Sequence, residues 1–119
     1  MRTIQELLDK QKVLMEVVPH GLRPDVQGKV VAGLGLIEEI LEYLSACGHK
    51  SWRPQPLSRE KQLEEIADIQ FFNAELILLS GFSWDEIAQE YDRKHAENLD
   101  RYRRGKEGDY GWDSRGKGL

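Results

Sequence analysis

Two pairs of acidic residues at the same spacing constrain this 119-residue chain more than any other feature. One pair is Glu39-x-x-Glu42, the other is Glu65-x-x-Asp68, and each lies in a segment rich in apolar residues. At a spacing of i, i+3, both carboxylates of a pair leave the same face of an α-helix. The sequence therefore predicts two helices that pack together and direct four carboxylates towards one place.

Four carboxylates that converge at a partly buried position repel one another and lose hydration. A hard divalent cation that prefers oxygen ligands relieves both effects. We therefore predict a metal site made by Glu39, Glu42, Glu65 and Asp68, with Mg²⁺ as its natural occupant and Mn²⁺ as a substitute. The alternative is two solvated acidic stripes on ordinary amphipathic helices, which a single Glu-x-x-Glu pair would favour.

The apolar periodicity of the chain is helical throughout, and no strand-like alternation persists. Ser58 is a suitable N-cap, Gly48 and Gly81 are helix stops, and Ser83-x-x-Glu86 is a capping box. Helices are expected over residues 3–18, 29–47, 58–80 and 83 to about 104. The predicted fold class is therefore all-α, a small bundle of about four helices with short connections.

The length indicates one domain, which we place at residues 1–104. Residues 105–119 contain five glycines, and the C-terminal end is locally basic from Arg101 onward, so a flexible tail that orders over bound phosphates is expected over residues 105–119. Gly33 and Gly35 in the apolar second helix are predicted to permit close helix packing. Because a core of this size gains from a partner subunit, the protein is predicted to oligomerise, as a homodimer or a homotetramer.

The composition excludes several classes of protein. Charged residues make up 32% of the chain and the net charge is −4, which gives no case for bulk nucleic-acid binding. No segment approaches the roughly 18 continuous apolar residues of a membrane span. Cys47 is the single cysteine, so an internal disulfide is excluded and a reducing cytoplasmic location is expected.

A basic face is predicted on the fourth helix. Lys94, Asn98 and Arg101 lie at i, i+4 and i+7, so they present two cations and an amide together. Arginine and lysine suit phosphate oxygens, although a solvated charged helix is the alternative. Beside a carboxylate-held metal, such a face supplies the other half of a site for phosphoryl transfer or pyrophosphate release.

Two further residues are candidates for binding a nucleobase. Trp52 lies in the proline-containing loop between the acidic pairs, where its ring can stack on a base or cover the core. Gln11 on the first helix can read a base edge through its amide, or it can simply be exposed. The chain has no phosphate-binding loop motif and no nucleophile elbow, so water is the expected nucleophile.

These motifs together resemble the all-α nucleoside triphosphate pyrophosphohydrolases, the superfamily of MazG proteins and dimeric dUTPases. The family signature is Glu-Glu-x-x-Glu followed by Glu-x-x-Asp, which corresponds to Glu38-Glu39-x-x-Glu42 and Glu65-x-x-Asp68. The resemblance extends from the helix that carries Gln11, through Lys50-Ser51-Trp52, to Lys94-x-x-x-Asn98-x-x-Arg101 and the Gly-rich stretch over residues 104–110.

The resemblance implies that the four acidic residues of the two pairs bind Mg²⁺ and that one of the glutamates of the first acidic helix, with Glu39 as the first candidate, orients the attacking water. It also implies that Lys94, Asn98, Arg101 and Tyr110 hold phosphates. Enzymes of this family cleave between the α and β phosphates, use more than one divalent ion, and are commonly dimers or tetramers.

The leading prediction is therefore a Mg²⁺-dependent deoxynucleoside triphosphate pyrophosphohydrolase that favours dUTP. Another dNTP, such as dGTP or dCTP, is the alternative within the same chemistry. Two alternatives belong to other classes: a non-catalytic helical dimerisation module, and a nucleotide sensor that binds without cleaving.

Overall fold

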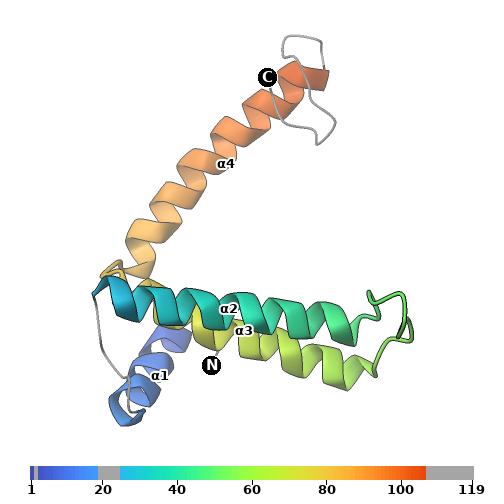
Figure 1. Ribbon diagram of the computed structural model, residues 1–119. Helices are drawn as coiled ribbons and strands as arrows, with labels where there is room; N and C mark the ends of the chain where they lie inside the picture. Colours follow the sequence, from blue (N-terminus) through green and yellow to red (C-terminus); the bar gives the residue numbers. More distant parts are fainter. Residues whose placement is uncertain (2, 19–24, 107–119) are drawn as a thin grey trace. The chain divides into compact units, whose positions relative to one another are not determined.

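A computed structural model of the chain describes residues 1, 3–18 and 25–106. It contains four α-helices, namely α1 (Ile4–Val17), α2 (Val26–Ala46), α3 (Arg59–Leu79) and α4 (Trp84–Lys106) (Figure 1). Within these described residues there is no strand, and β pairing is limited to an isolated bridge between Lys50 and Arg53. The predicted all-α class is confirmed.

The chain divides into two compact units, Met1–Ser83 and Trp84–Leu119. The first unit holds α1, α2 and α3, and the second holds α4. Helix α4 extends to Lys106, two residues beyond its predicted end. Most of the predicted Gly-rich tail, from residue 107 onward, lies outside the described residues.

The first three helices begin at side chains that accept a hydrogen bond from the backbone of the first turn. The Thr3 hydroxyl accepts from the Glu6 N–H at 3.1 Å, Asp25 Oδ1 from the Gly28 N–H at 2.9 Å, and Ser58 Oγ from the Lys61 N–H at 3.2 Å. Each cap stabilises its helix by about 1 kcal/mol. The predicted start of the second helix at residue 29 is wrong, because the Asp25 cap allows α2 to begin at Val26.

Glycines in the left-handed region end α2 and α3. Gly48 has φ = 81° and Gly81 has φ = 75°, values that side chains with a Cβ rarely adopt. A Cβ at Gly48 would also lie 2.3 Å from the carbonyl oxygen of Pro54. The chain therefore turns tightly at Gly48 and returns to start α3.

Helix α3 packs against both α1 and α2, and α2 and α3 run side by side (Figure 1). The core cluster contains one buried residue from each of these three helices, namely Met15, Ala32 and Leu79. At Gly35, an added Cβ would lie 2.3 Å from the ring of Phe72, so this glycine permits the close approach of α2 and α3. The predicted packing role is confirmed for Gly35.

None of the helices in the described part of the chain combines the length and the apolar character that crossing a membrane requires.

Candidate metal centre

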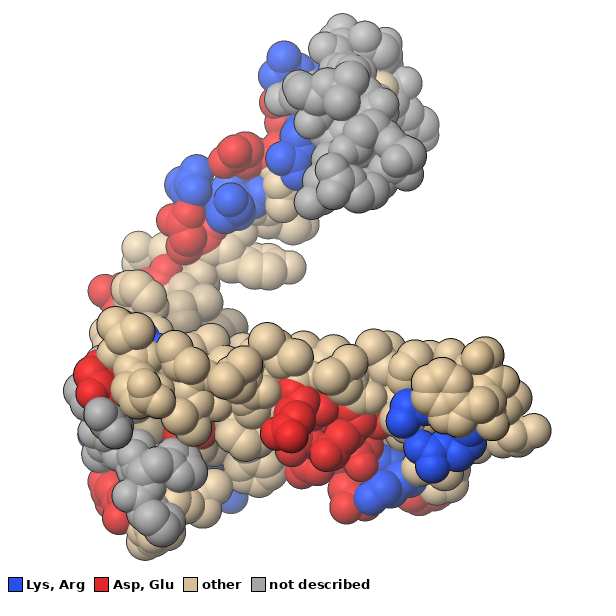
Figure 2. Space-filling model, in the orientation of Figure 1, with Lys and Arg blue, Asp and Glu red and all other residues tan. Residues whose placement is uncertain are grey.

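Three of the four predicted metal ligands meet where α2 and α3 lie together. Glu39 and Glu42 come from α2 and Glu65 comes from α3, and one carboxylate oxygen of each lies within 4.8 Å of the others. Figure 2 shows acidic side chains gathered on this part of the surface, with basic side chains beside them. Acidic residues spaced three apart on α2 and an acidic residue of α3 therefore form one cluster, as the sequence predicted.

Glu39 is the most perturbed carboxyl of the cluster. Its side chain is half-buried, and its Oε2 is buried without a hydrogen-bond partner. The pKa of Glu39 is raised from 4.5 to about 7, first by burial, then by the nearby carboxyl of Glu42, and then by the charges of Asp68 and Glu65. Ionising Glu39 is therefore less favourable than ionising an ordinary glutamate, and a positive charge entering the cluster would reverse this effect.

Glu65 is buried, with 7% of its surface exposed. Its Oε2 is also buried without a hydrogen-bond partner, while its Oε1 lies 3.5 Å from the Lys61 ammonium. Two buried carboxylate oxygens in one cluster thus have no donor from the described residues. Since a buried acceptor without a partner destabilises a fold by about 1–3 kcal/mol, a positively charged ligand of these oxygens would stabilise the cluster.

Asp68 lies at the edge of the cluster. Its charge contributes to the raised pKa of Glu39, but its carboxylate oxygens fall outside the group that lies within 4.8 Å. Asp68 is therefore near enough to affect Glu39, but its carboxylate lies farther from the three glutamates than they lie from one another.

Lys61 is a residue of this site that the sequence analysis missed. It lies 3.6 Å from Glu64 and 3.5 Å from Glu65, and the two carboxylates, Glu64 first, raise the pKa of the ammonium. The signal was present in the sequence, because Lys61 and Glu65 are separated by four positions on one helix face. Lys61 therefore supplies a partial counter-charge to the cluster when no cation is bound.

Gln11 lies in the wall of a cavity between α1 and α3. The cavity has a volume of about 240 Å³ and is mainly apolar. Its lining residues are Met1, Leu7, Lys10, Gln11, Ala67, Gln70 and Phe71. Gln11 is only 6% exposed, so the alternative of an ordinary exposed glutamine is wrong. This volume is below the roughly 300–1,000 Å³ of pockets for whole drug-sized ligands, which suits one ring rather than an entire nucleotide.

Trp52 is 79% exposed in the loop between α2 and α3. The Lys50 ammonium lies 5.9 Å from the centre of its ring, within reach of a weak cation–π contact. The alternative that Trp52 covers the core is therefore wrong. An exposed aromatic face with a cation beside it is available to a ligand.

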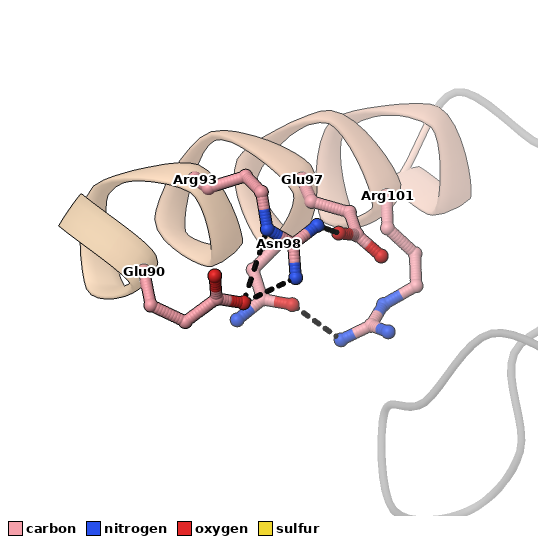
Figure 3. Close-up of polar contacts among 5 residues, drawn as sticks. All are labelled: Glu90, Arg93, Glu97, Asn98 and Arg101. Atoms are coloured by element: carbon pink, nitrogen blue, oxygen red, sulfur yellow. Dashed lines mark hydrogen bonds and ion pairs between the residues drawn. The ribbon is translucent and has the colours of Figure 1, made fainter. Parts of the chain in front are cut away.

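The predicted phosphate residues of α4 lie in the second unit. Arg101 Nη2 donates a hydrogen bond to Asn98 Oδ1 at 2.9 Å, so these two residues share a face as predicted (Figure 3). Lys94 is exposed on the same helix. Tyr110 lies outside the described residues.

Five other charged residues of α4 form pairs along the helix. Arg93 contacts Glu90 and donates to Glu97 at 3.0 Å (Figure 3), and Arg104 lies 3.2 Å from Asp100. The guanidinium of Arg93 lowers the pKa of Glu90. These contacts account for five charged residues of α4 without any ligand.

The chain matches no model of a known protein family, no curated protein and no solved structure. The resemblance to the all-α pyrophosphohydrolases therefore stays a prediction that rests on the motifs.

Proposed function

We propose that this protein is a Mg²⁺-dependent deoxynucleoside triphosphate pyrophosphohydrolase that favours dUTP and releases a nucleoside monophosphate and pyrophosphate. The observation that carries the proposal is the convergence of Glu39, Glu42 and Glu65 from two helices to within 4.8 Å. Like charges gather in this way at metal sites, because a cation between them offsets their repulsion.

The donor atoms fit a hard divalent cation. All three residues of the group offer carboxylate oxygens, and the group includes no histidine or cysteine among the described residues. Oxygen donors alone favour Mg²⁺ or Mn²⁺ over Zn²⁺. The buried Oε2 atoms of Glu39 and Glu65 have no hydrogen-bond partner, so both are free to become ligands. When bound, the metal would neutralise phosphate charge and acidify a water molecule.

Glu39 is the residue we assign to the attacking water. Its Oε2 is buried without a hydrogen-bond partner, so this oxygen can accept a hydrogen bond and then a proton from a water molecule. Glu39, Glu42, Glu65 and Asp68 would together hold the cation. Water attacks the α-phosphorus, the bond to the bridging oxygen breaks, and pyrophosphate leaves.

The cavity between α1 and α3 supports a place for the nucleobase. Its apolar wall suits a planar ring, and the Gln11 amide offers one acceptor and two donors to the edge of that ring. Ala67 lines the cavity and directly precedes Asp68, so the base and the phosphates would lie along the same helix. Trp52 is proposed as a second stacking surface.

Lys94, Asn98, Arg101 and Tyr110 remain our proposed phosphate ligands. Arg101 and Asn98 already share a face of α4, and a guanidinium can bind two phosphate oxygens at once. We place the activity in the cytoplasm, as the single Cys47 suggests, and in a homodimer or homotetramer.

Two other functions are weaker candidates. The same chemistry on dGTP or dCTP is possible, because the cavity walls do not distinguish these bases. A non-catalytic dimerisation module or a nucleotide sensor is the second candidate, favoured by the row of exposed aliphatic residues on α2.

The test is pyrophosphate release from dUTP, dTTP, dCTP, dATP, dGTP and the ribonucleotides, each with Mg²⁺ and with chelator. We expect release that requires Mg²⁺ and is fastest with dUTP. Faster release from another dNTP would keep the reaction and change the substrate. If the folded protein released none from any nucleotide, the non-catalytic functions would replace the enzyme.

A further inference from the structure

Lys61 lies between two carboxylates of α3, one inside the acidic cluster and one beside it. Its ammonium nitrogen is 3.5 Å from Glu65 Oε1 and 3.6 Å from Glu64 Oε1. Both distances are longer than the roughly 2.7–3.2 Å of a well-formed N–H···O hydrogen bond. The ammonium is therefore held by charge, at nearly the same distance from both carboxylates.

The energetics of α3 alone do not explain a lysine at this position. Lys61 is in the first turn of α3, and its N–H donates to the Ser58 Oγ cap at 3.2 Å. Three residues after a serine cap, glutamate or glutamine is favoured because it completes a capping box. The positive end of the helix dipole also disfavours a cation in the first turn. Finally, a lysine four residues before a glutamate is the less favourable order for such a pair.

The buried carboxylate of Glu65 does explain Lys61. Glu65 is only 7% exposed, and its Oε2 is buried without a hydrogen-bond partner. A buried carboxylate is unfavourable unless a positive charge lies beside it. The Lys61 ammonium, at 3.5 Å from Oε1, supplies that charge from within the chain.

A divalent cation on Glu65 would compete with this ammonium. Both would face the same carboxylate, and like charges a few ångströms apart repel one another strongly in a partly buried site. Glu64 offers the ammonium another partner, because it already lies 3.6 Å away. A small rotation of the Lys61 side chain towards Glu64 is therefore enough to release Glu65.

We propose that Lys61 is an internal competitor of the metal, which neutralises Glu65 while no cation is bound and turns towards Glu64 when a divalent cation binds. Lys61 thereby sets the Mg²⁺ concentration at which the cluster fills. This inference rests on the metal site of the proposed function, but it does not require that the chain cleave a nucleotide. The rival role is a lysine that orients Glu65 as a ligand, and the two roles predict changes of opposite sign.

The first test is a calorimetric titration of Mg²⁺ into the full chain, without nucleotide, at about 0.15 M salt. Lys61→Met keeps the aliphatic stem and removes the charge, so the dissociation constant should fall by about fivefold or more. Lys61→Gln, a second neutral variant, should behave in the same way. Lys61→Arg keeps the charge and should stay within about twofold of wild type.

The matched control is Arg59→Met. It removes the same charge from the first residue of α3, two positions before Lys61. Because long-range effects of charge are largely screened at this salt concentration, its dissociation constant should change by less than about twofold. A decrease as large as that in Lys61→Met would mean that net charge alone controls Mg²⁺ binding, and it would overturn the competitor role.

The second test concerns Glu64. Glu64→Gln removes the alternative partner of the ammonium, so the dissociation constant for Mg²⁺ should rise by about threefold or more. In the Lys61→Met background the same change should have little effect, because no ammonium is left to move. Equal effects in the two backgrounds would show that the residues act independently, and would overturn the movement of Lys61 to Glu64.

The outcomes separate this inference from the proposed function. Tighter Mg²⁺ binding in Lys61→Met supports it, whereas unchanged or weaker binding in the folded variant would overturn it. If neither wild type nor Lys61→Met bound Mg²⁺, the metal site and the role of Lys61 would both be wrong. The expected pattern of binding without pyrophosphate release would reject the enzyme and keep the role of Lys61. Circular dichroism of each variant confirms that the helices remain folded.

Discussion

The charged residues of α4 and those at the junction of α2 and α3 are arranged in different ways. On α4, Arg93 pairs with Glu90 and Glu97 within one helix, and most of these groups are exposed. At the junction, Glu39, Glu42 and Glu65 converge from two helices, and Lys61 is a nearby cation. Opposite charges paired along one helix neutralise each other, and the pairs need no further ligand. Carboxylates that converge from two helices repel one another, which destabilises the fold unless a ligand of opposite charge binds.

The strongest test of this contrast is catalytic. Glu65→Gln keeps the shape of the side chain and removes its charge, so we expect kcat/KM for dUTP to fall by about 10³-fold, or about 4 kcal/mol in transition-state stabilisation. Asp68→Ala should have a comparable effect if Asp68 completes the ligand set. The measurement is Mg²⁺-dependent pyrophosphate release.

Matched controls come from both regions. Glu60→Gln alters an exposed glutamate in the first turn of α3, outside both acidic pairs, and Arg93→Gln breaks the pairs on α4. Both should retain near-normal turnover. A folded Glu65→Gln variant with wild-type activity would show that the cluster is not the metal site.

The second test is metal removal followed by thermal or chemical unfolding at pH 8. On our proposal Mg²⁺ binds the folded cluster and not the unfolded chain, so a concentration 100 times its dissociation constant should raise the free energy of unfolding by about 2.7 kcal/mol relative to chelator. Glu42→Gln should lose most of this increase. An equal increase in wild type and Glu42→Gln would mean that Mg²⁺ acts elsewhere.

The third test is the pH dependence of stability in chelator. The pKa of Glu39 is raised in the folded state from 4.5 to about 7, so its stabilising contribution is present below pH 4.5 and is lost as pH rises through 7. We expect the free energy of unfolding to fall by about 1–2 kcal/mol over this range, once solvent screening of the partly exposed carboxyl is allowed for.

In Glu39→Gln this decrease should disappear, and the variant should be more stable than wild type at pH 8 without metal. An identical pH profile for the two proteins would contradict the raised pKa of Glu39.

The smallest effect is expected on α4. Arg93→Gln removes exposed pairs that contribute little in water, so the unfolding midpoint should barely change, and any difference should vanish in 1 M salt. Urea unfolding at low and high salt measures it. A large, salt-resistant loss of stability would mean that the α4 pairs are buried against something and that the contrast between the two regions is wrong.

The sequence predicted the helices well because their ends carry local signals. The side chain of Ser58 and the backbone of Gly48 and Gly81 determine helix ends within one turn of their own positions. Their effects can therefore be predicted from the sequence without knowing the tertiary structure. The start of α2 was predicted three residues late, because the cap at Asp25 follows a proline-containing connection that suggested a longer loop. The convergence of Glu39, Glu42 and Glu65 was predictable from their spacing alone.

Other properties depend on which faces meet, and periodicity does not reveal that. Gln11 was expected to be either a ligand-binding or an exposed residue, and its burial against α3 follows only from the packing of α1. Gly33 and Gly35 are equivalent in sequence, yet only Gly35 faces Phe72. Tertiary contacts thus decide what two identical residues do.

The loop between α2 and α3 has a further consequence for the acidic cluster. Its end is fixed by a 2.7 Å hydrogen bond from the Leu57 N–H to the Ala46 carbonyl, and the Gln62 amide donates to the Leu57 carbonyl at 2.9 Å. These bonds set the longitudinal register of the two helices. A shift of α3 along α2 by one helical turn, about 5.4 Å, would be larger than the 4.8 Å within which the carboxylate oxygens now lie. The loop therefore determines the distances between the carboxylates of the cluster. A substitution at Gly48 that shifts the loop can separate these carboxylates without changing any acidic residue.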